Sequence, residues 1–197
     1  KTASSAAHLY GRTMVMSENS FHLEHNWWKT PEKATHENRL NSAYYQAQLG
    51  VTHPASYFGY PDVDRGEYEL KAARAGLFTS YGTHKTDVLV LIPMTAAYER
   101  FAVPDHKYWD VGPCTVAPHQ GESVQNLESA YGTVLELLED RHFDFDLIDE
   151  AGLAGCSAEN GRIDTGYEDF SALVVFDSGT FEHDTRAVME KFLRSGG

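Results

Sequence analysis

The residues best suited to chemistry gather near the start of the chain, around Glu18. This carboxylate follows Thr13–Met16, a short apolar run that predicts a β-strand. Cleavage of a glycosidic bond needs two carboxyl groups, one to protonate the leaving oxygen and one to activate water or attack the sugar. Side chains that could assist a carboxylate in such a site follow shortly after it: His22, Glu24, His25, Trp27 and Trp28.

Taken by themselves, residues of these types more often have a purely structural role. A single Glu after a strand is commonly a solvated loop residue or a helix cap, and position alone does not assign function. Trp27 and Trp28 suit stacking on a sugar ring, but they also suit a core or an interface. His22 and His25 are ordinary loop histidines unless a second group engages them.

A second polar group accompanies Val51–Tyr60, whose valine, threonine and aromatic residues predict a strand despite Pro54. Where this strand would open into a cleft, four side chains could bind sugar hydroxyls: His53, Tyr57, Tyr60 and Asp62. A place in a surface loop or in the core is an equally open interpretation of the same residues.

The elements that would position these residues alternate between strand and helix, which predicts an α/β fold. In the first part of the chain, helices are expected at Thr2–Leu9, from Thr30 to about Leu49, and at Glu67–Tyr81. In the second part, helices are expected at Ser123–His142 and Glu182–Leu193, and a small hairpin within Gly152–Gly166.

Three apolar runs in the second part predict parallel strands that are buried on both faces. Their order in the sheet should be 2-1-3, with the first strand in the centre, as in doubly wound sheets of the flavodoxin type. These runs are Val88–Ile92, Phe143–Ile148 and Leu173–Phe176. A sheet of three strands keeps an open edge, so we expect the chain to be an internal segment of a longer protein.

Composition excludes several classes of protein. The 197 residues are 42% hydrophobic, which excludes a disordered chain, and no apolar run is long enough to cross a bilayer. The net charge of −13 argues against binding to nucleic acid, because a phosphate backbone would be repelled. Cys114 and Cys156 lack the spacing of a structural zinc site, and they fix neither a disulfide nor a compartment.

Several stretches, in order along the chain, resemble the large bacterial α-L-rhamnosidases of glycoside hydrolase family 106. They are Ala6-Ala7-His8-Leu9-Tyr10-Gly11-Arg12, Val15-Met16-Ser17-Glu18-Asn19-Ser20-Phe21, Trp28 with Thr30-Pro31-Glu32, Leu49-Gly50-Val51-Thr52-His53, Ala72–Gly82 with Lys85–Pro93, and Phe143–Glu150. The resemblance implies that residues 1–84 are the C-terminal part of a (β/α)8 barrel. It implies that residues 85–197 are the first half of a domain similar to class I glutamine amidotransferases.

The same resemblance implies a function and a site. Glu18 would be the catalytic carboxylate of a glycoside hydrolase, and its partner carboxylate would lie upstream, outside this chain, so that the segment alone would be inactive. Substrate-binding residues would be His22, Trp27, Trp28, His53 and Tyr57. The resemblance is compatible with bound calcium. The partners would be a carbohydrate and the rest of a longer chain, and not a membrane. The protein would be secreted or periplasmic. The alternative is a non-catalytic carbohydrate-binding or scaffolding protein with the same architecture.

The second domain is expected to be inert. Amidotransferase chemistry needs a cysteine on a sharp strand-to-helix turn, and neither Cys114 nor Cys156 occupies one. No glycine-rich phosphate loop follows Val88–Ile92, which argues against a free-standing flavodoxin-like module. The acidic residues near the second strand lack the pattern of a calcium loop, and we expect them to be solvated: Asp144, Asp146, Asp149 and Glu150.

Overall fold

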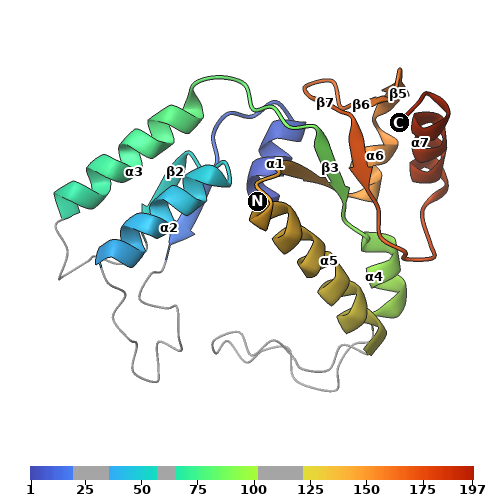
Figure 1. Ribbon diagram of the computed structural model, residues 1–197, viewed down its shortest axis with the longest axis horizontal. Coiled ribbons are helices and arrows are strands. Elements are labelled where there is room, and N and C mark those ends of the chain that lie inside the picture. The colour runs from blue at the N-terminus through green and yellow to red at the C-terminus, as the bar shows by residue number, and fades with distance from the viewer. Residues whose placement is uncertain (20–35, 57–64, 102–121) are drawn as a thin grey trace. The chain divides into compact units, whose positions relative to one another are not determined.

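The computed structural model describes residues 1–19, 36–56, 65–101 and 122–197, and it divides the chain into two compact units. Unit 1 is Lys1–His84 and unit 2 is Lys85–Gly197 (Figure 1). That unit 1 belongs to a barrel and unit 2 to an amidotransferase-like domain stays a prediction. None of the described helices is long and apolar enough to cross a membrane.

Unit 1 alternates helices with two short parallel strands. Its elements are α1 (Thr2–Leu9), β1 (Met16–Asn19), α2 (His36–Gln48), β2 (His53–Ser56) and α3 (Arg65–Ser80). The helix at Thr2–Leu9 is confirmed, and α3 agrees closely with its prediction. The predicted cap at Thr30 lies outside the described residues.

Both strands of unit 1 differ from their predicted bounds. The strand expected at Thr13–Met16 lies three residues later, at Met16–Asn19, and the one expected at Val51–Tyr60 is His53–Ser56. The reason is that a strand exists only where a partner backbone lies beside it, and the register pairs Met16 with His53 and Asn19 with Ser56. Glu18 is therefore inside β1 rather than after it.

Helix α3 packs closely on the start of β2. Tyr68 and Ala72 are buried, and with Gly76 they recur every four residues, which places them on one face of the helix. A Cβ atom at Gly76 would lie 2.2 Å from the carbonyl oxygen of Thr52. The approach of helix to strand thus depends on the absence of a side chain at position 76.

We expect Gly76→Ala to destabilise unit 1 by about 2 kcal/mol, because the new methyl group would push the backbone of α3 away from the backbone at Thr52. The matched control is Gly132→Ala in a helix of unit 2, where a Cβ atom would meet nothing within 4 Å. That change should stabilise the protein by up to about 1 kcal/mol through helix propensity. Urea denaturation followed by circular dichroism measures both, and equal effects of the two variants would contradict the proposed close contact.

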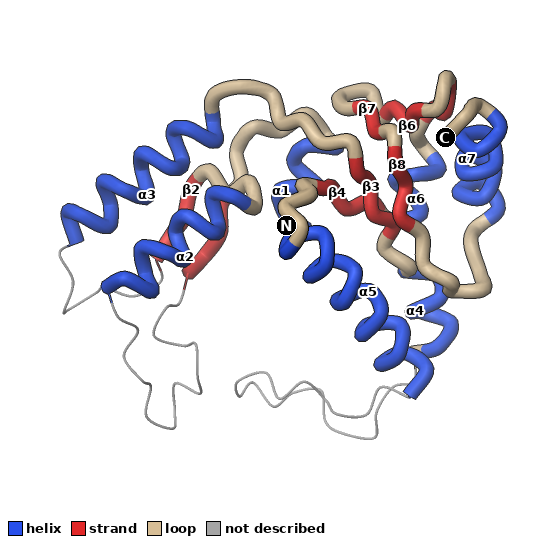
Figure 2. The backbone as a smooth tube through the Cα atoms, viewed as in Figure 1, coloured by secondary structure: helices blue, strands red, loops and turns tan. Residues whose placement is uncertain are grey.

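Unit 2 is built on a sheet of three parallel strands, β3 (Val88–Leu91), β4 (Phe145–Ile148) and β8 (Ala172–Val174), in the order β4-β3-β8. The predicted order 2-1-3 and the parallel directions are confirmed (Figure 2). The long connections contain α4 (Met94–Arg100), α5 (Glu122–Asp140) and α6 (Glu150–Ala154), and α7 (His183–Arg194) follows the last strand.

A second, antiparallel sheet of unit 2 consists of β5 (Ser157–Glu159), β6 (Arg162–Asp164) and β7 (Asp169–Phe170). The hairpin predicted within Gly152–Gly166 is confirmed by β5 and β6. Its two-residue turn is Asn160-Gly161, and both residues have positive φ, at 53° and 69°. This is the conformation that lets a tight turn follow the natural twist of the two strands.

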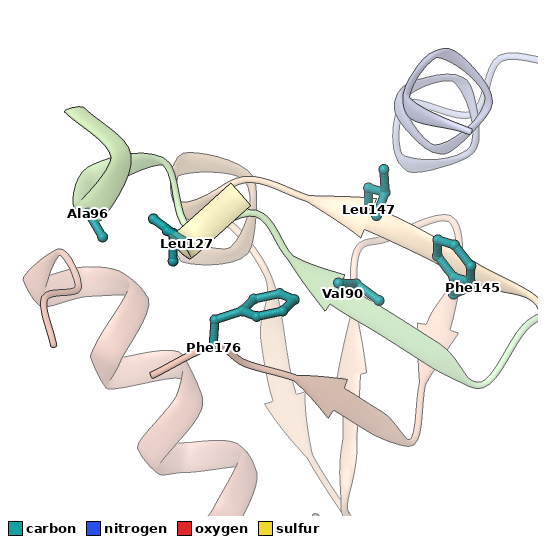
Figure 3. Packing of buried hydrophobic residues seen from close by; sticks show 6 residues of the cluster. All are labelled: Val90, Ala96, Leu127, Phe145, Leu147 and Phe176. Atoms are coloured by element: carbon teal, nitrogen blue, oxygen red, sulfur yellow. The ribbon is translucent and has the colours of Figure 1, made fainter. Parts of the chain in front are cut away.

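One core cluster of unit 2 lies between the parallel sheet and the helices α4 and α5. Its buried residues come from strands, helices and the segment after β8, and Figure 3 shows them together: Val90, Ala96, Leu127, Phe145, Leu147 and Phe176. Helix α5 adds Tyr131, Val134, Leu135 and Leu138, whose spacing places them on one face of the helix. The apolar runs of β3 and β4 therefore pack as their composition predicts.

Candidate functional site

The strand pair β1–β2 of unit 1 holds the backbone of Glu18. In the parallel register Glu18 lies opposite Ala55, two residues after the pair Met16 and His53, which corresponds to a shift of about 7 Å along the strands. Parallel strands end at the same side of a sheet, and in β/α barrels that side carries the active site. Glu18 is the third of four residues in β1, so its backbone lies towards that end.

Thr52, the residue before β2, forms hydrogen bonds with Val15, the residue before β1. Its side chain is buried, with 6% exposure, and Oγ1 accepts a hydrogen bond from the backbone N–H of Val15 at 2.9 Å. The same oxygen lies 3.1 Å from the carbonyl oxygen of Val15 and 2.8 Å from Nδ1 of His53. The exposed imidazole of His53 is thereby tied to a buried hydroxyl group.

A pocket of about 380 Å³ lies between the start of β2 and α3. It is bounded on the strand side by Thr52, His53 and Pro54 and on the helix side by Tyr68, Glu69, Ala72, Ala73, Gly76, Leu77 and Ser80. The lining combines an imidazole, a carboxylate and hydroxyl groups with small apolar side chains. His53 thus borders this pocket at the beginning of β2, rather than at the end of the strand.

The structure places only part of the predicted site. The backbone of Glu18 and the side chain of His53 lie on neighbouring strands. The other predicted members lie outside the described residues, in 20–35 and 57–64: His22, Glu24, His25, Trp27, Trp28, Tyr57, Tyr60 and Asp62. The sequence interpretation missed Thr52, because a threonine beside a histidine gives no pattern that distinguishes it.

The expectation that the acidic residues near β4 are solvated is wrong for two of them. Asp146 is fully buried and Glu150 is 3% exposed. Oε1 of Glu150 accepts a hydrogen bond from the backbone N–H of Thr95 at 3.0 Å, and Oε2 accepts one from that of Glu182 at 2.9 Å. These N–H groups begin α4 and α7, where helices leave backbone donors unpaired.

The other two acidic residues, Asp144 and Asp149, accept hydrogen bonds from backbone N–H groups close to them in the sequence. Asp144 accepts a hydrogen bond from the N–H of Phe145 at 2.9 Å, and Asp149 caps α6 by accepting one from the N–H of Gly152 at 2.7 Å. Calcium needs six to eight converging oxygen atoms. The carboxylates of Asp144, Asp149 and Glu150 instead accept backbone hydrogen bonds, which gives these three residues structural roles.

Cys156 has the properties of an inert thiol. It follows α6, its Sγ donates to the carbonyl oxygen of Gly152 at 3.3 Å, and it is half-buried. Burial, with a smaller effect of Asp164, raises the pKa of Cys156 to about 11. Since the thiolate is the nucleophile, this cysteine is unsuited to amidotransferase chemistry. Cys114 lies outside the described residues.

Comparison with known proteins shows a likeness of fold to a solved structure. No protein-family profile and no curated protein matches the sequence. The solved structure titled "Structure of Rhamnosidase from Novosphingobium sp. PP1Y" aligns with 98% of this chain, with a TM-score of 0.54 and 15% sequence identity. The fold of this chain is similar to part of a rhamnosidase. The alignment covers 18% of that chain, and at this identity it bears on the fold alone.

Proposed function

We propose that this chain contributes to a glycoside hydrolase, in which Glu18 is a catalytic carboxylate. The observation that supports the proposal is the parallel pairing of β1 with β2, since parallel strands are the units of β/α barrels and the fold is similar to part of a rhamnosidase. The alignment covers 18% of that rhamnosidase, so the enzymatic activity of the whole protein is itself proposed.

In this proposal, hydrolysis requires Glu18 and a second carboxyl group on the opposite side of the scissile bond. If the two carboxyl groups are about 5 Å apart, one of them acts as a nucleophile and the enzyme is retaining. If they are about 6.5–9.5 Å apart, a water molecule fits between the base and the sugar and the enzyme is inverting. Tyr57 and His22 would bind sugar hydroxyl groups near Glu18. His53, which stands at the beginning of β2, would bind a hydroxyl group farther from the scissile bond. Trp27 and Trp28 would stack on the apolar faces of sugar rings.

The substrate class proposed is an α-L-rhamnoside. Its test is hydrolysis of 4-nitrophenyl glycosides by the natural gene product that contains this sequence. We expect release of 4-nitrophenol from the α-L-rhamnoside well above the rate in buffer, and little release from the matching glucoside and galactoside. Hydrolysis of another sugar would reject rhamnose as the substrate, while binding of L-rhamnose without any hydrolysis would favour the non-catalytic alternative.

A further inference from the structure

The hydrogen bonds around Thr52 determine where its single hydroxyl proton goes. A threonine hydroxyl has one proton to donate and two lone pairs that accept. One lone pair is used by the N–H of Val15, at 2.9 Å. The proton can go to the carbonyl oxygen of Val15 at 3.1 Å or to Nδ1 of His53 at 2.8 Å.

The carbonyl oxygen of Val15 is already satisfied by backbone donors. It accepts hydrogen bonds from the N–H groups of both Thr52 and His53, each at 3.0 Å. A carbonyl oxygen has two lone pairs. Both donors are backbone N–H groups, and the main chain fixes their directions. The hydroxyl group would be a third donor to this oxygen, at 3.1 Å, and would compete with the two N–H groups for its lone pairs. The shorter bond from the hydroxyl group to Nδ1 of His53, at 2.8 Å, is therefore favoured over the alternative in which an Nδ1–H group donates to the hydroxyl oxygen.

We propose that Thr52 is a positioning residue that holds His53 in the neutral tautomer with its proton on Nε2, directed to a ligand oxygen. When Nδ1 accepts from Thr52, Nε2 must carry the proton of the neutral ring. Among the described residues Nε2 has no hydrogen-bond partner, and the ring is exposed beside the pocket between β2 and α3. His53 is then a hydrogen-bond donor prepared for an acceptor, not a base.

The ligand class follows from this donor. An Nε2–H group on a fixed ring suits a hydroxyl oxygen of a sugar, and the identity of that ligand rests on the proposed function. The tautomer does not rest on it, because the protein's own backbone determines it. The two claims can therefore fail separately.

The test is long-range ¹H–¹⁵N correlation spectroscopy of the histidine rings at about pH 8, where an ordinary histidine is neutral. A His53→Gln variant identifies the signals of His53. In the wild type we expect the pattern of a proton on Nε2. In Thr52→Val, which keeps the shape but removes the hydroxyl group, the share of the Nδ1–H form should rise roughly fivefold, the equilibrium effect of one ordinary hydrogen bond. Thr52→Ser keeps the hydroxyl group and should restore the wild-type pattern.

A proton on Nδ1 in the wild type, or an unchanged ratio in a folded Thr52→Val, would overturn the proposal. If Thr52→Val fails to fold, the patterns of the wild type and of Thr52→Ser still decide the tautomer. Titration with L-rhamnose examines the ligand separately: we expect affinity to fall roughly fivefold in Thr52→Val and to recover in Thr52→Ser. The Nε2–H pattern without any rhamnose binding would reject rhamnose as the ligand, yet it would leave the role of Thr52 intact.

Discussion

Replacing Glu18 by glutamine should lower turnover of an aryl α-L-rhamnoside by roughly 10²- to 10⁴-fold while substrate affinity is retained. Glutamine keeps the size and much of the hydrogen bonding of glutamate but cannot donate or accept the transferred proton. The measurement is kcat and KM with the natural gene product. The control is Glu37→Gln, an exposed glutamate in the first turn of α2, which should leave turnover unchanged.

The leaving group can separate the roles of Glu18. If Glu18 is the general acid, loss of its proton matters less for 4-nitrophenol, a good leaving group, than for a simple alcohol. Turnover of an alkyl rhamnoside should then fall much more than that of the aryl rhamnoside. If Glu18 is the nucleophile or the base, both substrates should lose turnover to a similar degree. Near-normal turnover on both substrates would remove Glu18 from the mechanism.

Replacing Glu150 by alanine should destabilise unit 2 by about 2–4 kcal/mol. The carboxylate group accepts backbone hydrogen bonds from Thr95 and Glu182, so its removal leaves the starts of α4 and α7 without their acceptor. Urea denaturation measures the loss. Amide hydrogen exchange gives a local signature, because the N–H groups of Thr95 and Glu182 should exchange faster in the variant than in the wild type.

Two further variants show whether the effect comes from these hydrogen bonds. Glu150→Gln replaces one acceptor oxygen by a donor and should be less stable than the wild type but more stable than Glu150→Ala. Glu159→Ala removes a glutamate that is 70% exposed and lies 3.8 Å from Lys191, and it should change stability by less than about 0.5 kcal/mol. Equal stability of Glu150→Ala and Glu159→Ala would contradict the role of Glu150.

The parts of the fold that the sequence predicts are those with a strong local signal. The apolar runs of β3 and β4 predicted strands that are buried, as continuous hydrophobic runs in parallel sheets usually are. The run at β8 predicted a strand, but the prediction that it is buried is wrong, because no residue of β8 is fully covered. The order of the three strands was predicted from the doubly wound topology. The hairpin at β5–β6 was predictable from its turn residues. These signals lie within a few neighbouring residues and need no knowledge of the tertiary structure.

The predictions that failed depended on contacts distant in sequence. The strand β1, Met16–Asn19, is mostly polar, and only its pairing with β2 sets its bounds. Glu150 looked like a solvated acid because nothing local shows that the starts of α4 and α7 converge on it. For the same reason Thr52 was missed, since its partner Val15 is far away along the chain.

The strand order of unit 2 also constrains how the protein is made. The central strand β3 is synthesised first, and both strands that cover its edges, β4 and β8, follow much later. A ribosome-bound chain therefore exposes the apolar residues Val88–Leu91 with two open edges until Phe145–Ile148 has emerged, and with one open edge until Ala172–Val174 follows. Unpaired apolar edges of this kind attract other chains. Folding yield should thus depend on elongation rate and chaperone supply more than the stability of the finished sheet would suggest.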